Sequence, residues 1–343
     1  MTSVIGWDIG GAHLKAARAE QGRIVEAFHT PCTPHHGLAL LEQAIALASE
    51  RLGSAQRHGV TMTAELSDAF ETRARGVATI AAIFKRQIKS EHIDFYAGEG
   101  GFVPYSAIGE HAGAIASANW RASAELVARR LDAALFIDMG STTTDLVPID
   151  GGAVTALGGG DCERLANGEL AYCGLVRGDP LAGLTLAPID GRWTPLVRES
   201  FASMADVHRV LGDLPEGADV MPTADGRAKT AEASIARLAR LAGFDAADAS
   251  VEQWRSFAAF LARAQMRLIE DQIALLQSRG AIAREAPFVG AGVGRALIER
   301  SARAEGRAYR DFCEFLDAAP NAARAASDCA PAAAVALLVG ARG

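Results

Sequence analysis

The sequence has few cysteines, no run of basic residues and no long apolar stretch, and each shortage excludes a class of protein. The five cysteines are odd in number and lack Cys-x-x-Cys spacing, which argues against a disulfide framework and a structural zinc site. With 34 basic and 41 acidic residues the net charge is −7, so the electrostatic footprint of a nucleic-acid-binding protein is missing. We expect a reducing compartment and no nucleic-acid partner.

Membrane, export and histidine-metal signals are missing as well. No stretch of about 18 apolar residues occurs, and Asp8 interrupts the region where a signal peptide would need an apolar run. The histidines show no His-Glu-x-x-His spacing, so none is a candidate metal ligand. We expect a cytoplasmic protein with no membrane partner.

The length and composition indicate a globular enzyme-sized chain. The 343 residues correspond to about two domains at ~150 residues each. Half of the residues are hydrophobic and 22% are charged, which is too apolar for a disordered chain. A single small binding module is therefore excluded.

A pattern of strand, acidic-glycine turn and strand occurs twice along the chain. The first copy runs from a strand at Ser3 to Trp7 through Asp8-Ile-Gly-Gly to a strand at Leu14 to Ala19. The second copy begins at Ala133, about 130 residues later, and contains Asp138 to Asp145. This internal duplication predicts two related α/β halves.

The first turn has the residue types of an anion or metal site. Gly10 and Gly11 allow the backbone to approach an anionic ligand, Asp8 can hold a metal directly or through water, and Lys15 is one of only four lysines. A hairpin whose Asp and Gly only satisfy turn chemistry remains an alternative.

The second turn offers more ligand groups. Asp138 is followed by Gly140 and the hydroxyl residues Ser141, Thr142 and Thr143, which suit metal coordination and short hydrogen bonds to phosphate oxygens. The alternative is a plain hairpin in which threonine is favoured for its strand propensity.

Two further segments contain candidate site residues. Gly290, Gly292 and Gly294 lack the last spacing of a Rossmann motif, and we expect them to clear a flat surface for adenine or another planar group. Glu65 follows a predicted strand at Val60 to Ala64 and is a candidate general base or metal partner; a solvated acid or helix N-cap is the alternative.

The remaining elements are predicted from apolar spacing. Helices are expected at 38–52, about 70–88, 108–118, 251–278, from Arg295 and at 331–339, with a strand at 287–289. The Gly-, Pro- and Asp-rich stretch at 158–226 predicts loops and short elements.

The motifs resemble those of the actin-like ATPase superfamily, which includes sugar kinases, Hsp70 chaperones and the hydantoinase and oxoprolinase group. DIGGAHLKAA (8–17) and DMGSTTTDLVPI (138–149) resemble its two phosphate motifs, and FVGAGVGRALI (288–298) resembles its nucleotide or third-loop motif. MTAELSDAF (62–70), SANW (117–120), ERLANGELAYCGLVRG (163–178) and TADGRAKTAEAS (223–234) are similar to a narrower group. That group comprises the condensing enzymes of methanofuran biosynthesis and bacterial relatives of the tetrahydromethanopterin-linked one-carbon pathway.

The resemblance implies an α/β fold with two actin-like lobes around a phosphate-binding crevice. We expect an N-terminal lobe at 1–130 and a C-terminal lobe at 131–328 with a loop-rich insertion at about 158–230. A terminal helix within 329–343 is expected to pack back on the first lobe.

The resemblance also implies a reaction, namely condensation of an aminomethylfuran-methanol diphosphate with the phenol of γ-glutamyltyramine, with release of diphosphate. Asp8, Lys15, Glu65 and Asp138 would be catalytic, and Asp8 and Asp138 would bind Mg²⁺. ATP could bind the same loops but is not required, and a homodimer is left open. The alternatives are an ATP-dependent kinase or oxoprolinase-type amidohydrolase, and a non-enzymatic nucleotide switch.

Overall fold

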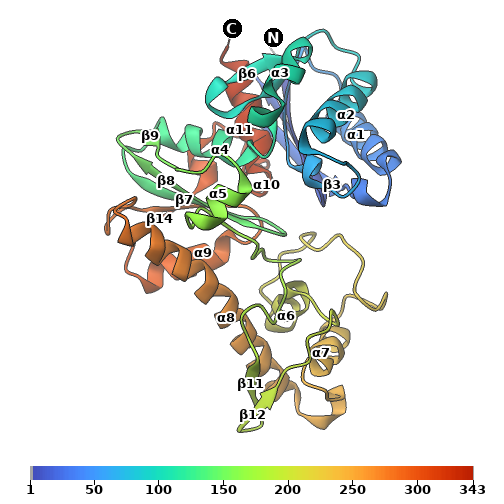
Figure 1. Cartoon of the computed structure of the whole chain (residues 1–343), viewed down its shortest axis with the longest axis vertical. Coiled ribbons are helices and arrows are strands. Elements are labelled where there is room, and N and C mark those ends of the chain that lie inside the picture. The colour runs from blue at the N-terminus through green and yellow to red at the C-terminus, as the bar shows by residue number, and fades with distance from the viewer. Residues whose placement is uncertain (1–2, 343) are drawn as a thin grey trace.

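The structure, a computed structural model, describes residues 3–342, and residues 1, 2 and 343 of the expected domains lie outside the described residues (Figure 1). Two mixed sheets form two lobes. The first sheet has the order β3-β2-β1-β4-β5-β6. Its strands are β1 (Ser3–Ile9), β2 (His13–Glu20), β3 (Arg23–Pro31), β4 (Arg57–Met62), β5 (Ile93–Tyr96) and β6 (Phe102–Pro104).

The second sheet repeats the central part of the first. Its order is β10-β8-β7-β13-β14, with β9 paired to β8. In both sheets an antiparallel hairpin, β1–β2 or β7–β8, is followed by a parallel neighbour, β4 or β13. The strands are β7 (Ala134–Met139), β8 (Thr144–Asp150), β9 (Ala153–Val154), β10 (Leu170–Ala171), β13 (Phe288–Ala291) and β14 (Tyr309–Asp311). The predicted α/β, two-lobed actin-like architecture is confirmed.

Helices cover the first sheet because their apolar residues recur on one face. In α1 (Leu38–Leu52), Leu41, Ile45 and Ala48 are buried, and the helix ends before Gly53, whose φ is +71°. α2 (Arg73–Gln87) begins where the Thr72 side chain accepts a hydrogen bond from the Arg75 amide. It is shorter than the predicted helix at 70–88.

The predicted strand at Val60 to Ala64 and the predicted helix at 108–118 were wrong in their bounds. The strand is β4, and residues 64–66 form a short 3-10 helix instead. The helix α3 (Ile108–Ile115) ends early because Ala116 pairs with Met62 of β4, and Ser117 has a φ of +55°. A separate helix, α4 (Asn119–Ala128), then begins.

Two alanine-rich helices, α4 and α11 (Ala330–Gly340), lie between the sheets and contact each other (Figure 1). α11 packs on β1, β2 and β4, and a Cβ at Gly6 would lie 2.1 Å from the Ala332 carbonyl oxygen. Only glycine at this position allows so close an approach. One hydrophobic cluster therefore includes residues of both sheets.

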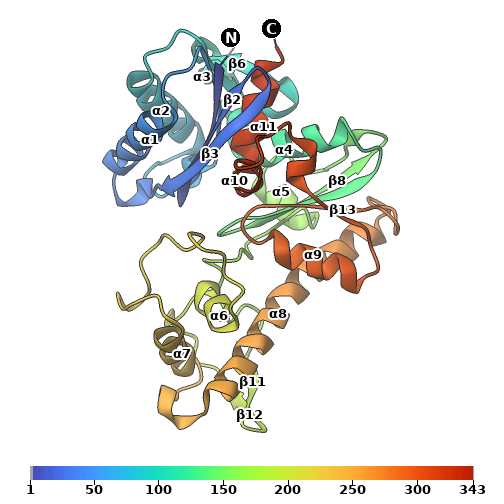
Figure 2. The ribbon, with the colours of Figure 1, turned by 180° about the vertical axis from the view of Figure 1, so that it is seen from behind.

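A small module, made of β11, β12, α6, α7 and the first half of α8, extends below both lobes (Figures 1 and 2). Its hydrophobic cluster includes Trp254, Phe257 and Leu261 of α8, while Ile269 and Ile273 of the same helix pack in the second lobe. The bounds are β11 (Leu186–Ile189), β12 (Arg192–Pro195), α6 (Met204–Leu211), α7 (Ala231–Arg240) and α8 (Val251–Ser278). The remaining helices are α5 (Asp161–Ala166), α9 (Arg295–Ala304) and α10 (Ala323–Asp328).

Within residues 3–342, no helix combines the length and apolar character needed to cross a membrane.

Candidate functional site

The two hairpin turns line one cavity of about 580 Å³, which we call the interlobe cavity. The turns close in the same way, because the Gly10 amide donates to the His13 carbonyl at 2.9 Å and the Gly140 amide donates to the Thr143 carbonyl at 2.9 Å. Residues of the turns that line the cavity are Gly10, Gly11, Gly140, Ser141, Thr142 and Thr143. The structure thus brings together the two segments that the sequence separates by 130 residues.

Asp8 and Asp138 also line this cavity, and both carboxyl groups are buried. Burial raises the pKa of Asp8 to about 6, against the opposing charge of Lys15. Burial likewise raises the pKa of Asp138 to about 7. One oxygen of each group, Oδ1, has no hydrogen-bond partner among the described residues. Such buried, unpaired carboxylate oxygens are rare in proteins unless they bind something.

Lys15 supplies the positive charge beside these two groups. Its Nζ lies 3.9 Å from Asp8 Oδ2, and its neighbour across the hairpin is Asp8 itself. Burial would lower the pKa of Lys15, but the charges of Asp8 and Asp138 outweigh it and raise the pKa. The ammonium therefore stays charged beside Asp8, within the influence of both carboxyl groups.

The donor set fits Mg²⁺ held jointly by protein and ligand. Asp8 Oδ1, Asp138 Oδ1 and Ser141 Oγ are all oxygen atoms that lack a partner. No group of three or more His, Cys, Asp or Glu side chains in residues 3–342 is arranged to hold a metal ion. Mg²⁺ commonly binds one or two carboxylates and completes its shell with water and substrate phosphate oxygens. The two aspartates match that mode of binding.

The second turn is held by a segment that follows β10. The amides of Val176 and Arg177 both donate to the Ser141 carbonyl, at 3.0 and 2.8 Å. Gly174 packs so closely that a Cβ there would lie 2.5 Å from the backbone of Ser141 and Thr142. Gln265 Nε2 of α8 donates to the Gly174 carbonyl at 2.8 Å. These contacts fix the turn in place before any ligand binds.

Glu65 lies behind the cavity wall rather than in it. Ser117, which lines the cavity, donates its hydroxyl to Glu65 Oε1 at 3.0 Å. Burial raises the pKa of Glu65 to about 7, and its Oε2 has no partner among the described residues. Gly76 of α2 leaves the space for it, because a Cβ there would lie 2.8 Å from Glu65 Cβ. The structure thus connects Glu65 to the cavity through one hydroxyl group.

The glycines Gly290, Gly292 and Gly294 do not line the interlobe cavity, and their surroundings differ from the expected flat surface. A Cβ at Gly290 would lie 2.6 Å from the Tyr309 ring, so an aromatic ring of the protein already covers this glycine. A Cβ at Gly292 would lie 2.3 Å from Asp138 Oδ1. At Gly294 it would lie 2.4 Å from the Met139 side chain. In this structure Gly292 and Gly294 make room for β7, and Gly290 makes room for Tyr309 of β14.

Several polar residues of the cavity were missing from the sequence-based set of site residues. Asp145 of β8 lies opposite Asp138 across the hairpin and accepts a hydrogen bond from Arg164 Nη1 at 2.7 Å. Ser117 lies in the break between α3 and α4, and Asn119 is the first residue of α4. One signal could have found Asp145: it follows Asp138 by seven residues, as Lys15 follows Asp8.

Comparisons with known proteins agree with this description. The profile of the hydantoinase/oxoprolinase family matches residues 56–310. A protein of Methanocaldococcus jannaschii, named (4-{4-[2-(gamma-L-glutamylamino)ethyl]phenoxymethyl}furan-2-yl)methanamine synthase, is 28% identical over 278 residues, which cover 80% of this chain and 82% of that protein. The protein of the same name from Methanococcus vannielii is 35% identical over 120 residues, or 34% of this chain and 53% of that one.

A solved structure shares the fold. The alignment with the nucleotide-free structure of acetone carboxylase covers 95% of this chain and 70% of the acetone carboxylase chain. The TM-score is 0.55 and the sequence identity is 12%. The likeness concerns the arrangement of the chain alone. Since the family profile covers most of the sequence, including β13 and the cavity-lining segments after residue 56, the chain belongs to the hydantoinase/oxoprolinase family.

Proposed function

We propose that this protein is a transferase of cofactor biosynthesis that joins an aminomethylfuran-methanol diphosphate to the phenol of γ-glutamyltyramine. The name of the relative from Methanocaldococcus jannaschii describes the ether product of that reaction. The observation that carries the proposal here is the pair of turns around one cavity with buried, unpartnered oxygen atoms. This arrangement suits a diphosphate group and its counter-ion.

In the proposed reaction the phenol oxygen attacks the furanylmethyl carbon. The bond between that carbon and the diphosphate oxygen breaks, and its electron pair leaves with diphosphate. A new carbon–oxygen ether bond forms, and the phenolic proton passes to a base. The products are the ether and diphosphate, so no ATP is consumed.

The turns would hold the leaving group. Gly11, Ser141 and Lys15 line the cavity, and their amide groups, the Ser141 hydroxyl and the Lys15 ammonium would bind the negative charge of the diphosphate. Fixed donors of this kind stabilise charge that grows in the transition state. Asp8 and Asp138 would hold Mg²⁺, which would neutralise part of the charge on the departing diphosphate.

The Ser117–Glu65 pair would accept the phenolic proton. A phenol has a pKa of about 10, so its attack is aided by a base. Ser117 would pass the proton from the cavity to Glu65, whose raised pKa of about 7 keeps it a competent base near neutral pH. The unusual φ of +55° at Ser117 fits a residue held in place by its surroundings for a functional reason.

The test is a product assay with purified protein, Mg²⁺, the furan diphosphate and γ-glutamyltyramine. We expect mass spectrometry to find the ether and one diphosphate per ether formed, without ATP. Stoichiometric ADP with product would favour the ATP-dependent kinase or amidohydrolase. Absence of the ether with every furan diphosphate tried would overturn the proposal.

A further inference from the structure

A second cavity of about 770 Å³ adjoins the interlobe cavity. It lies between the short 3-10 helix Pro34–His36 of the first lobe and the small module. His35 and Arg177 line both cavities, so the two spaces meet at these residues. The volume falls in the range of about 300–1,000 Å³ that is typical of small-molecule sites.

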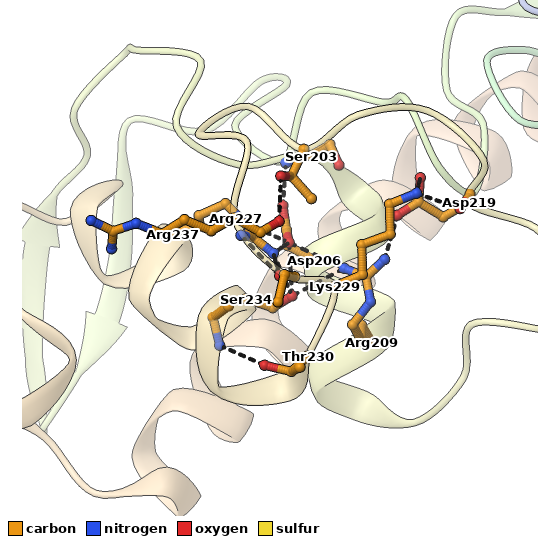
Figure 3. Close-up of polar contacts among 12 residues, drawn as sticks. Ser203, Asp206, Arg209, Asp219, Arg227, Lys229, Thr230, Ser234 and Arg237 are labelled. Atoms are coloured by element: carbon orange, nitrogen blue, oxygen red, sulfur yellow. Dashed lines mark hydrogen bonds and ion pairs between the residues drawn. The ribbon is translucent and has the colours of Figure 1, made fainter.

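One wall of the second cavity is an ion-pair network in which the acidic side chains Asp206 and Asp219 are already paired (Figure 3). Asp206 is buried and accepts hydrogen bonds from Ser234 Oγ at 2.7 Å and Arg237 Nε at 2.8 Å. Arg209 and Lys229 both bind Asp219. The acidic side chains of this wall therefore have protein cations as partners and are not free to bind a ligand cation.

Four exposed charged residues of the same cavity make no ion pair within the described residues, namely Arg177, Asp179, Arg198 and Glu199. Arg198 and Glu199 lie between β12 and α6 and line the cavity, and neither side chain makes an ion pair or hydrogen bond within the described residues. Arg177, at the junction of the two cavities, is also unpaired there. Arg198 and Glu199 are neighbours in the sequence, and an unpaired guanidinium and an unpaired carboxylate that line one cavity suit a ligand that carries both a carboxylate and an ammonium group.

The space between these charges is partly apolar. Val176, Leu181, Met221 and Pro222 line it. Such side chains pack well against an aromatic ring, and methionine adapts to its shape. A ligand with a ring near Arg177 and an amino-acid group near Arg198 would match both features.

We propose that the second cavity binds the acceptor, a phenol linked through an amide to an α-amino acid. Its amino-acid carboxylate pairs with Arg198, its ammonium group pairs with Glu199, and its phenol points past Arg177 into the interlobe cavity. The choice of acceptor rests on the proposed function. A phosphate ligand fits this cavity less well, because Glu199 would repel it beside Arg198.

Binding measured apart from turnover tests the assignment. By calorimetry or ligand-observed NMR, Arg198→Gln and Glu199→Gln should each weaken γ-glutamyltyramine binding by about tenfold, the effect of one lost charge-assisted contact. N-acetyltyramine, which keeps the phenol and amide but lacks the amino-acid group, should bind all variants equally. Arg192→Gln, a change of an exposed arginine on β12 outside the cavity, is the matched control and should change neither affinity.

The outcomes separate this proposal from the proposed function. Unchanged γ-glutamyltyramine affinity in both variants, or an equal loss for N-acetyltyramine, would overturn the acceptor site. If the ether forms but the KM for γ-glutamyltyramine is unchanged in Arg198→Gln, the site is wrong and the reaction stands. If the selective loss of binding is seen but no ether forms, the reaction is wrong and the site stands.

Discussion

The hairpins β1–β2 and β7–β8 have the same frame but opposite charges at matching positions. Each has an aspartate near the end of its first strand and a glycine amide that closes the turn at 2.9 Å. Across the strand pair, however, Asp8 faces Lys15 whereas Asp138 faces Asp145. The duplicated fold thus sets where ligand groups lie, and single side chains decide the charge that each lobe contributes.

The charge difference has a visible physical consequence. Asp145 adds a third carboxyl group near Asp8 and Asp138. Burial is the main cause of the raised pKa of Asp138, and the negative charge of Asp145 raises that pKa further. Arg164 compensates by binding Asp145 while lying over the Trp120 ring at 4.1 Å. Lys15 therefore supplies the positive charge that interacts with both Asp8 and Asp138. This cation comes from the first hairpin.

The largest expected effect comes from removing either aspartate charge. Asp8→Asn and Asp138→Asn should each lower turnover by about 10²–10³, the usual loss when one charge-stabilising contact of a reaction site is removed. The melting temperature should change little for Asp138→Asn, which removes a buried carboxyl group whose Oδ1 has no partner, and should fall for Asp8→Asn, which leaves Lys15 without its ion-pair partner. Calorimetry with Mg²⁺-diphosphate should show weaker binding by both variants; unchanged affinity in either one would show that its lobe does not hold the ligand.

The second comparison concerns the residues at the end of the parallel strand in each lobe. Glu65 follows β4, whereas Gly292 and Gly294 follow β13. We therefore expect a proton acceptor at this position in the first lobe alone. Glu65→Gln should lower kcat by roughly 10². The wild-type rate should rise with pH through about 7, as Glu65 loses its proton. Measured with saturating Mg²⁺, which would hold Asp8 and Asp138 ionised, the variant should lose that rise, whereas a purely structural role for Glu65 would leave the rise in place.

The free energy of unfolding should also depend on pH through Glu65, and it should decrease as the pH rises. Burial raises the pKa of Glu65 from 4.5 to about 7 in the folded protein, so between these values the unfolded chain has lost a proton that the folded protein keeps. The wild type should therefore lose stability as pH rises through this window, by on the order of 3 kcal/mol relative to Glu65→Gln. Urea unfolding at pH 5 and pH 8 measures this, with exposed Glu71→Gln as a control. A pH-independent difference would contradict the raised pKa.

Lys15 and Asp145 test the charge comparison directly. Lys15→Met removes the cation shared by Asp8 and Asp138 and should weaken diphosphate binding by about tenfold. Asp145→Asn should change diphosphate affinity by less than about threefold. The substitution removes a negative charge and leaves Arg164 without its acidic partner, and neither change should weaken the binding of an anion. Equal losses from the two changes, measured by calorimetry, would mean that the hairpins contribute alike.

The last comparison concerns the two turn glycines, whose replacement affects stability. A Cβ at Gly10 would lie 2.7 Å from the His13 carbonyl oxygen, but at Gly140 it would lie 3.4 Å from the Thr143 carbonyl oxygen. Gly10→Ala should therefore cost about 1–3 kcal/mol of stability, and Gly140→Ala less than about 1 kcal/mol. Urea unfolding of both variants decides whether the first turn is the tighter one.

The sequence was informative where the pattern is local and repeated. The two strand–turn–strand segments predicted the hairpins and the two lobes, and the structure places Asp8 and Asp138 at one cavity. It was not informative at Ser117, because the helix there ends through pairing of Ala116 with β4, a contact between distant segments. The glycines at 290–294 were misplaced for a similar reason, since Tyr309 and Met139 occupy the space above them. Their roles depend on neighbours that local composition does not specify.

The close packing of α11 on β1 has a consequence for how the chain folds. Gly6 lies against Ala332, and Gly59 of β4 against Val335, so strands near one end of the described chain are covered by a helix near the other. Contacts between such distant segments form late, because closing the long intervening loop costs entropy before any contact is gained. The first sheet cannot complete its core until α11 has arrived, and α4 joins the same cluster with residues of the second sheet. Despite their matching hairpins, the two lobes should therefore fold as one cooperative unit.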